Sequence, residues 1–103
     1  MDSYKVLMID DCRECYVGTV VRTFEEGINK LQSETWDEVR LDHDLGEEKN
    51  GNDICNWLEL HPEHQPKAVM LVTANPVGRD NMRRALLAMG YKEAVPAIYF
   101  QKD

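Results

Sequence analysis

Residues 68–76 read AVMLVTANP, and this stretch decides the fold class. Its first five residues, Ala68–Val72, form a continuous apolar run, which is typical of a strand that is buried on both faces. Thr73 ends the run, and Asn75 followed by Pro76 supplies an N-cap residue and a first helical residue. A buried strand that leads at once into a helix indicates an α/β protein with parallel strands.

The same alternation of strands and helices extends outward in both directions. Thr23 and Glu26 fit a capping box, Pro62 stops a helix, and Gly90 fits a C-terminal cap. The expected strands are Lys5–Ile9, Thr19–Arg22, Asp37–Leu41, Ala68–Val72 and Ala97–Phe100, and the expected helices are residues 24–31, 52–60 and 76–89. We therefore predict one α/β domain over residues 1–103, with a five-stranded parallel sheet and helices on both faces.

The connection between the first two strands is unusually short. Only Cys12–Gly18 lies between the acidic pair after the first strand and the start of the second strand. A crossover between parallel strands normally takes a dozen or more residues. We therefore expect the first helix to be shortened or missing.

The composition narrows the classes of partner. The chain has 103 residues and a net charge of −7, which argues against generic nucleic-acid binding, because a basic surface supplies most of that affinity. No apolar run approaches the roughly 18–20 residues of a membrane span, and no signal-peptide pattern is present. Three cysteines cannot form a full disulfide framework, which favours a reducing compartment. We expect a cytoplasmic protein without membrane partners.

Cys12 and Cys15 form a CxxC pair, which raises the alternatives of a zinc site or a redox site. Zinc needs two further ligands, and His61 and His64 are candidates, although their context, HPEHQP, favours a loop. A redox CxxC should open a helix, whereas this pair lies in a short, charged connector. Both alternatives are disfavoured, and no role is assigned to these cysteines.

Polar residues follow the expected strands where the strands end. Because the carboxyl ends of parallel strands share one edge of the sheet, where ligands of α/β proteins bind, these residues should lie together. They are Asp10, Asp11, Asp42, Asp44, Thr73, Asn75 and Lys102. Clustered carboxylates repel one another unless a cation lies between them, and Mg²⁺ prefers oxygen ligands. The sequence therefore predicts a Mg²⁺ site formed by the four aspartates, with Asp44 as the secondary ligand.

The other residues of this edge suit a phosphorylated ligand. Asp42 is the candidate nucleophile of an aspartyl-phosphate mechanism, or a metal ligand beside an activated water, and both alternatives stay open. The hydroxyl of Thr73 and the ammonium of Lys102 are candidate catalytic partners of a phosphate oxygen. The helix start at Asn75 offers backbone N–H groups, and Arg79 in its first turn is a candidate bidentate phosphate ligand.

The stretch LDHDLG at residues 41–46 also invites comparison with other metal motifs. An EF-hand is disfavoured, because Gly46 stands at a ligand position and Asp53 closes the loop in place of glutamate. A histidine–aspartate hydrolase motif needs further histidines and aspartates on several helices. His43 is therefore either a structural residue or a substrate contact.

Together these motifs resemble a receiver domain, the phosphoacceptor module of two-component signalling. The acidic pair in Ile9–Asp11 (IDD) is similar to the pair after the first strand of receivers, and Asp42 in LDHDL matches the phosphoacceptor. Val72–Ala74 (VTA) matches the fourth-strand hydroxyl element, and Lys102 matches the fifth-strand lysine. The resemblance covers nearly the whole chain. It implies a small flavodoxin-like, three-layer fold with Mg²⁺ beside Asp42.

Several departures resemble a narrower family, the cyclic-phosphate processing receiver domains of bacteria and their viruses. The elements LDHDLG (41–46), GNDICNWL (51–58) and ANPVGRDNM (74–82) carry this resemblance. It implies a Mg²⁺-dependent domain that processes or recognises a cyclic-phosphate nucleotide or a related phosphoester, often in host–virus conflict. A phosphoesterase is the enzyme activity that it suggests, and a homodimer is a candidate assembly.

Three functional alternatives stay open. Val72 stands where relatives are expected to carry a histidine, so a protein that sequesters a nucleotide without cleaving it is the first alternative. A receiver-shaped module that binds a protein partner is the second. A signalling receiver that is phosphorylated on Asp42 is the third.

Overall fold

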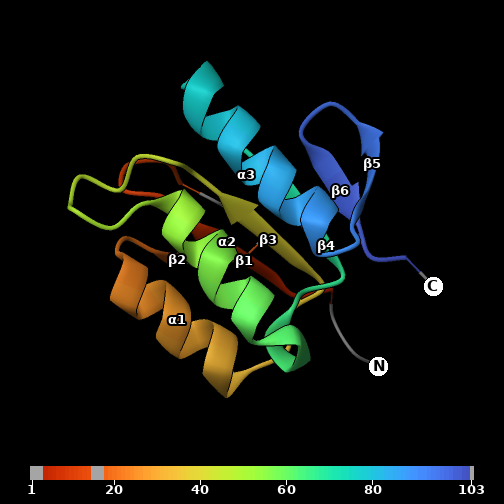
Figure 1. The fold of residues 1–103 in the computed structure, drawn as a ribbon. Coiled ribbons are helices and arrows are strands. Elements are labelled where there is room, and N and C mark those ends of the chain that lie inside the picture. The colour runs from red at the N-terminus through yellow and green to blue at the C-terminus, as the bar shows by residue number, and fades with distance from the viewer. Residues whose placement is uncertain (1–3, 15–17, 103) are drawn as a thin grey trace.

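A computed structural model describes residues 4–14 and 18–102. Figure 1 shows strands and helices alternating along most of this part of the chain. The strands are β1 (Val6–Ile9), β2 (Thr19–Val21), β3 (Glu38–Leu41), β4 (Ala68–Leu71), β5 (Lys92–Val95) and β6 (Ile98–Phe100). The helices are α1 (Phe24–Ser33), α2 (Gly51–Leu60), α3 (Pro76–Ala88) and the short 3₁₀ helix η1 (Pro62–His64). The strand and helix sequence predicted above is confirmed, with boundaries shifted by one or two residues and one further strand, β5.

The strands form one mixed sheet in the order β2-β1-β3-β4-β6-β5. Strands β1 to β4 are parallel, whereas β6 pairs antiparallel with β4 and β5 pairs antiparallel with β6. The predicted five-stranded parallel sheet is therefore wrong at its C-terminal edge. The reason is a tight turn at Pro96 and Ala97, where Ala97 has a φ of 74°, which folds the last strand back as a hairpin.

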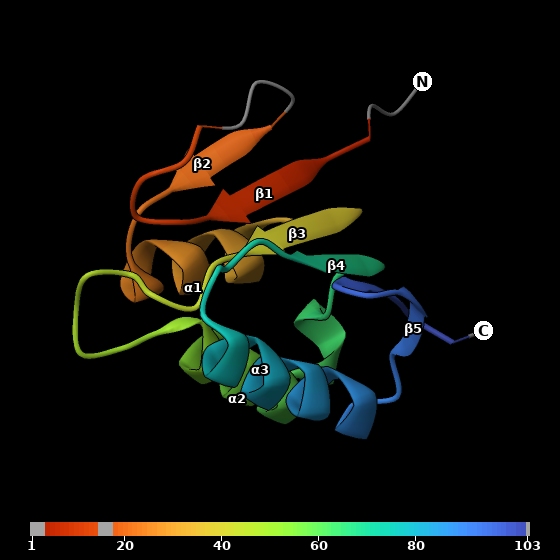
Figure 2. The same cartoon turned by 90° about the horizontal axis from the view of Figure 1, so that it is seen from above.

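All three α-helices pack on the same face of the sheet, as Figure 2 shows from above. One core joins Leu31 of α1, Leu58 of α2 and Leu86 of α3 to alternate strand residues. The strand residues of this core include Leu7, Ile9, Val39, Leu41, Val69 and Leu71. The described chain thus has two layers, and the predicted third layer of helices is absent from it.

The handedness of the connections explains the two layers. The connections through α1, α2 and α3 all lead in one direction across the sheet, from β2 toward β5. Because such crossovers are right-handed, they place their helices on one face. Among the connections that join parallel strands, only the one from β1 to β2 leads the other way, and its described residues contain no helix. The prediction of a shortened or missing first helix agrees with this part of the chain.

Each α-helix starts with a side-chain cap, and the caps at Thr23 and Asn75 were predicted. The side chain of Thr23 accepts a hydrogen bond from the backbone N–H of Glu26, while the Glu26 carboxylate accepts from the N–H of Arg22. Asn50 and Asp53 form a reciprocal capping box at α2. Asn75 caps α3 by accepting from the N–H of Gly78. No helix within the described ranges is long and apolar enough to cross a membrane.

Cys55 is expected to resist alkylation in the native protein. Its side chain is fully buried on the core-facing side of α2, and this burial raises the pKa of the thiol to about 12. Since the thiolate is the reactive form, iodoacetamide should modify the exposed Cys12 and leave Cys55 unmodified. Peptide mapping by mass spectrometry checks this, with a denatured sample as the control. Rapid native labelling of Cys55 would contradict the packing of α2.

Candidate metal centre

Three carboxylates meet at the carboxyl end of the parallel strands. Asp10 and Asp11 follow β1, and Asp42 follows β3. Because Ile9 pairs with Leu41 in parallel register, Asp10 and Asp42 leave the sheet side by side. One oxygen from each of the three carboxylates lies within 4.8 Å of the others. The predicted convergence of the two strand ends is therefore confirmed.

Asp10 is fully buried and is held by hydrogen bonds. Its Oδ1 accepts from the backbone N–H groups of Cys12 and Arg13, each at 2.9 Å, and its Oδ2 accepts from Nη1 of Arg13 at 3.0 Å. Burial alone raises the pKa of Asp10, but these hydrogen bonds and the charge of Arg13 outweigh burial, so the pKa lies below its ordinary value. Asp10 is therefore a stable anion in the folded protein.

The pKa of Asp42 is shifted in the opposite direction to that of Asp10. Burial and the neighbouring charge of Asp10 raise the pKa of Asp42 above its ordinary value. Hydrogen bonds from the His43 backbone and the Thr73 hydroxyl oppose this rise only in part, as does the charge of Arg13. The charge of an ionised Asp42 is therefore compensated only in part, and a bound cation would complete the compensation.

Arg13 and Arg22 were not predicted as site residues. Nη1 of Arg13 lies 3.9 Å from Oδ2 of Asp42 as well as beside Asp10, so its guanidinium bridges the two strands. Nη1 of Arg22 donates to the carbonyl oxygens of Asp10 and Arg13 at 3.1 and 2.6 Å. The sequence signal was the spacing: an aspartate commonly accepts from the N–H groups two and three residues later, which turns residue 13 back toward Asp10.

The donor set fits a hard divalent cation. Its atoms are carboxylate oxygens, and the buried Thr73 hydroxyl lies beside Asp42. Magnesium commonly binds one or two protein carboxylates and keeps several waters. Asp11 is exposed at the rim of the cluster, so water can reach a cation bound there. A divalent cation bound here would supply the positive charge that lets a phosphate group approach this acidic protein. Asp10, Asp11 and Asp42 are the residues that would hold it.

Asp44 is not part of this cluster. Its carboxylate is exposed and lies 3.0 Å from Nδ1 of His43, and the described carboxylates that gather within 4.8 Å do not include it. The side chain of His43 is largely buried against the start of α3, where a β-carbon on Gly78 would lie 2.4 Å from the imidazole ring. The structure thus gives His43 a packing role, and its predicted substrate contact stays a prediction.

Asn75 and Arg79 lie in the first turn of α3. The amide oxygen of Asn75 serves as the helix cap, and its backbone N–H donates to Oγ1 of Thr73 at 3.0 Å. This hydrogen bond fixes the Thr73 hydroxyl beside Asp42. Arg79 is exposed and lines a pocket of about 440 Å³ with residues of α3 and the β5–β6 hairpin. Their predicted contacts with substrate stay predictions.

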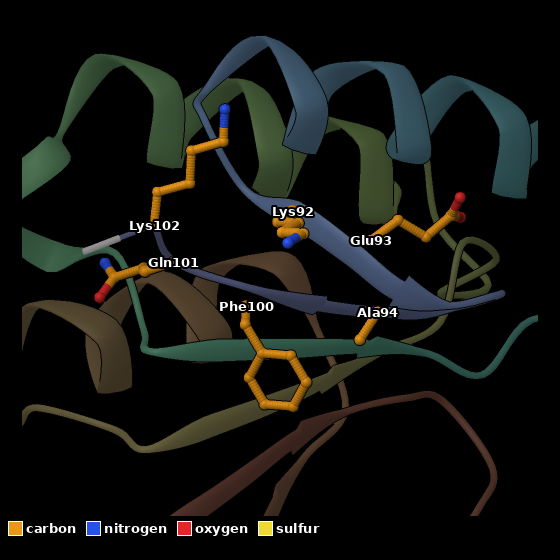
Figure 3. A pocket seen from close by; sticks show the side chains of 6 residues that line it. All are labelled: Lys92, Glu93, Ala94, Phe100, Gln101 and Lys102. Carbon is orange, nitrogen blue, oxygen red and sulfur yellow. The ribbon is translucent and has the colours of Figure 1, made fainter.

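Lys102 does not lie at the acidic end of the sheet, so this part of the predicted convergence is wrong. Because β6 runs antiparallel to β4, Phe100 pairs with Ala68, the first residue of β4, and the N–H of Gln101 donates to the carbonyl of Lys67. The chain after β6 is therefore at the opposite end of the sheet. Figure 3 shows Lys102 beside Gln101 at a pocket over the hairpin.

The alternative zinc site is not assembled by the described residues. Cys12 follows β1 at the carboxyl end of the sheet, whereas His61 and His64 lie between α2 and β4, at the start of β4. The two imidazole rings stack with Trp57, at centroid distances of 4.1 and 5.7 Å. Cys15 lies outside the described residues. The histidines are therefore packing partners of Trp57.

The fold and the site together define the class of protein. Parallel strands in the order β2-β1-β3-β4, with an acidic pair after β1, an aspartate after β3 and a hydroxyl after β4, are the features of a receiver-like domain. A comparison with family models agrees, because the model described as the cyclic-phosphate processing receiver domain matches residues 5–88. The chain belongs to this family. The match ends with α3, before the β5–β6 hairpin, and no curated protein matches the chain.

Proposed function

We propose that this domain uses Mg²⁺ at Asp10, Asp11 and Asp42 to process a cyclic-phosphate nucleotide or a related phosphoester. The observation that carries the proposal is the pairing of a stable anion, Asp10, with a less compensated one, Asp42, next to the Thr73 hydroxyl. A divalent cation would satisfy both carboxylates, and a phosphate oxygen would then complete its coordination. The Thr73 hydroxyl, which donates to Asp42 in the metal-free protein, would donate to another oxygen of the same phosphate once the cation neutralises Asp42.

The second candidate is a protein that binds such a nucleotide without cleaving it. Val72, directly before Thr73, has no titratable side chain, so this position supplies no general acid. Metal and phosphate binding need only the carboxylates and the hydroxyl. Catalysis needs a proton donor in addition, and this difference separates the two candidates.

Asp42→Asn is expected to abolish turnover in a panel of 2′,3′- and 3′,5′-cyclic nucleotides with Mg²⁺, because it removes a charged ligand from the cluster. Chromatography of the reaction products measures the turnover of each nucleotide. Glu59→Gln, on the exposed side of α2, makes the same charge change away from the site and should keep full activity.

The remaining outcomes separate the alternatives. No turnover by the unmodified protein across the panel would contradict the catalytic proposal. Tight binding, with intact nucleotide recovered after denaturation, would select the sequestering protein. One phosphoryl group added to Asp42 after incubation with acetyl phosphate, detected by intact mass, would instead favour a signalling receiver.

A further inference from the structure

Arg13 occupies the space between the two buried carboxylates. Its Nη1 lies 3.0 Å from Oδ2 of Asp10 and 3.9 Å from Oδ2 of Asp42. Among the described residues, it is the cation that forms salt bridges with these two aspartates. A divalent cation bound by the same oxygens would repel the guanidinium at this distance. Arg13 and a metal ion would therefore compete for the same carboxylates.

The backbone of Arg13 is fixed while its side chain is accessible. Its N–H donates to Oδ1 of Asp10, and its carbonyl accepts from Arg22 at 2.6 Å. Arg22 in turn pairs with Glu14 at 2.8 Å. The Arg13 side chain is 47% exposed, so its guanidinium has room to leave Asp10 without any change in the loop that carries it.

We propose that Arg13 is the phosphate-positioning residue of this site. Its guanidinium balances the charges of Asp10 and Asp42 until a divalent cation binds them, and it then donates to an oxygen of a phosphate group beside that cation. The planar guanidinium has five N–H donors and suits bidentate contacts with phosphate, whereas an ammonium does not. This inference rests on the proposed function and names the residue that recognises the phosphate.

The position of Lys102 supports this assignment. A basic side chain would add a charge-assisted contact to a phosphate held beside the cation, and Lys102, the predicted partner, lies at the opposite end of the sheet. The carboxyl end of β5, which does reach the same edge as Asp42, carries Val95 and Pro96. Arg13 brings the charge from the β1 loop instead.

The test measures two binding events with the full chain. Mn²⁺, which prefers the same oxygen ligands as Mg²⁺, is titrated and its free fraction is followed by electron paramagnetic resonance. Inorganic phosphate is then added, and its binding beside Mn²⁺ is followed by broadening of the ³¹P resonance. Arg13→Gln should bind Mn²⁺ roughly two- to fivefold more tightly, the range that a partly exposed ion pair supports. It should bind phosphate roughly tenfold more weakly, as expected for loss of a charge-assisted contact.

Two variants control this experiment. Arg84→Gln removes the same charge from the exposed side of α3, where Arg84 pairs with Asp80, and should behave as the unmodified protein. Arg13→Lys keeps the charge but loses the planar donors, so its phosphate affinity should lie between that of the unmodified protein and that of Arg13→Gln. It also guards against a folding defect in Arg13→Gln.

The outcomes separate this inference from the proposed function. If the unmodified protein retains no Mn²⁺, the proposed function fails. If the unmodified protein retains Mn²⁺ but Arg13→Gln leaves phosphate affinity unchanged, the positioning role of Arg13 is overturned and the metal site stands. Unchanged Mn²⁺ affinity in Arg13→Gln would equally overturn the competition between guanidinium and metal.

Discussion

Asp10→Asn and Asp42→Asn should each weaken Mn²⁺ binding on the order of 100-fold, yet they should change the stability of the metal-free protein in opposite directions. Two unit charges 4 Å apart interact by about 4 kcal/mol at an effective dielectric constant of 20, and each 1.4 kcal/mol is tenfold in affinity. Desolvation and screening reduce this value, which leaves roughly two orders of magnitude. Titration of each variant with Mn²⁺ measures the loss.

The opposite effects on stability follow from the two pKa shifts. The pKa of Asp10 is lowered in the folded protein, so its stabilising contribution is present above its unfolded pKa and is lost as the pH falls through the folded value. The pKa of Asp42 is raised, so its contribution is present below its unfolded pKa and is lost as the pH rises through the folded value. At neutral pH the ionised Asp42 therefore costs stability.

Thermal unfolding at neutral pH without metal measures whether each variant gains or loses stability. Asp42→Asn should melt above the unmodified protein, because it removes the repulsion from Asp10. Asp10→Asn should melt below it, because the hydrogen bond and ion pair with Arg13 are lost. Glu59→Gln serves as the neutral exposed control. A lower melting temperature for Asp42→Asn would show that its hydrogen bonds from Thr73 and His43 outweigh the repulsion.

The acidic part of the site was predictable because it depends on strand direction alone. Asp10 and Thr73 follow continuous apolar runs, Asp42 follows a strand with alternating apolar residues, and parallel strands bring such positions to one edge. Arg13 was harder to predict, because residue 13 reaches the site through a turn around Asp10 that only the hydrogen bonds reveal.

The C-terminal edge was not predictable from local patterns. Strand β5 reads KEAV, in which Lys92, Ala94 and Val95 are exposed, so it has no clear apolar alternation. The hairpin turn uses Pro96 and Ala97, and Ala97 adopts a positive φ that glycine or asparagine usually supplies. Because residues 96 and 97 are Pro-Ala and not an Asn-Gly or Gly-Gly pair, the sequence gives no signal that the chain reverses there. The misplacement of Lys102 followed from this missing signal.

The two-layer architecture depends on the order in which the strands are connected, and the apolar pattern of a strand does not reveal that order. The run Ala68–Val72 was interpreted as a strand covered on both faces, and Ala68, Val69 and Leu71 are indeed buried. Their burial comes partly from neighbouring strands and side chains, since the helices pack on one face only. Apolar continuity therefore predicted the strand correctly but overstated the number of helical layers.

Gly51→Ala should destabilise the protein by about 3 kcal/mol, although alanine favours helices by up to about 1 kcal/mol over glycine. Gly51 begins α2, and its N–H donates to the carbonyl of His43 at 2.8 Å. A β-carbon there would lie 2.1 Å from the carbonyl oxygen of Asp42 and 2.8 Å from the sulfur of Met82. The first contact is with backbone, so no rotation of a side chain relieves it. Either α2 or the Asp42 loop must move.

Differential scanning calorimetry and Mn²⁺ titration measure the two consequences of this movement. A loss of about 3 kcal/mol lowers the melting temperature of a domain of this size by roughly 10–20 °C. Mn²⁺ affinity should fall as well, because the clash displaces Asp42 relative to Asp10. Asn56→Ala, at an exposed position in the same helix, should leave both unchanged or raise the melting temperature slightly. If Gly51→Ala instead gains stability as Asn56→Ala does, α2 does not begin against Asp42, and the close link between this helix and the metal site is wrong.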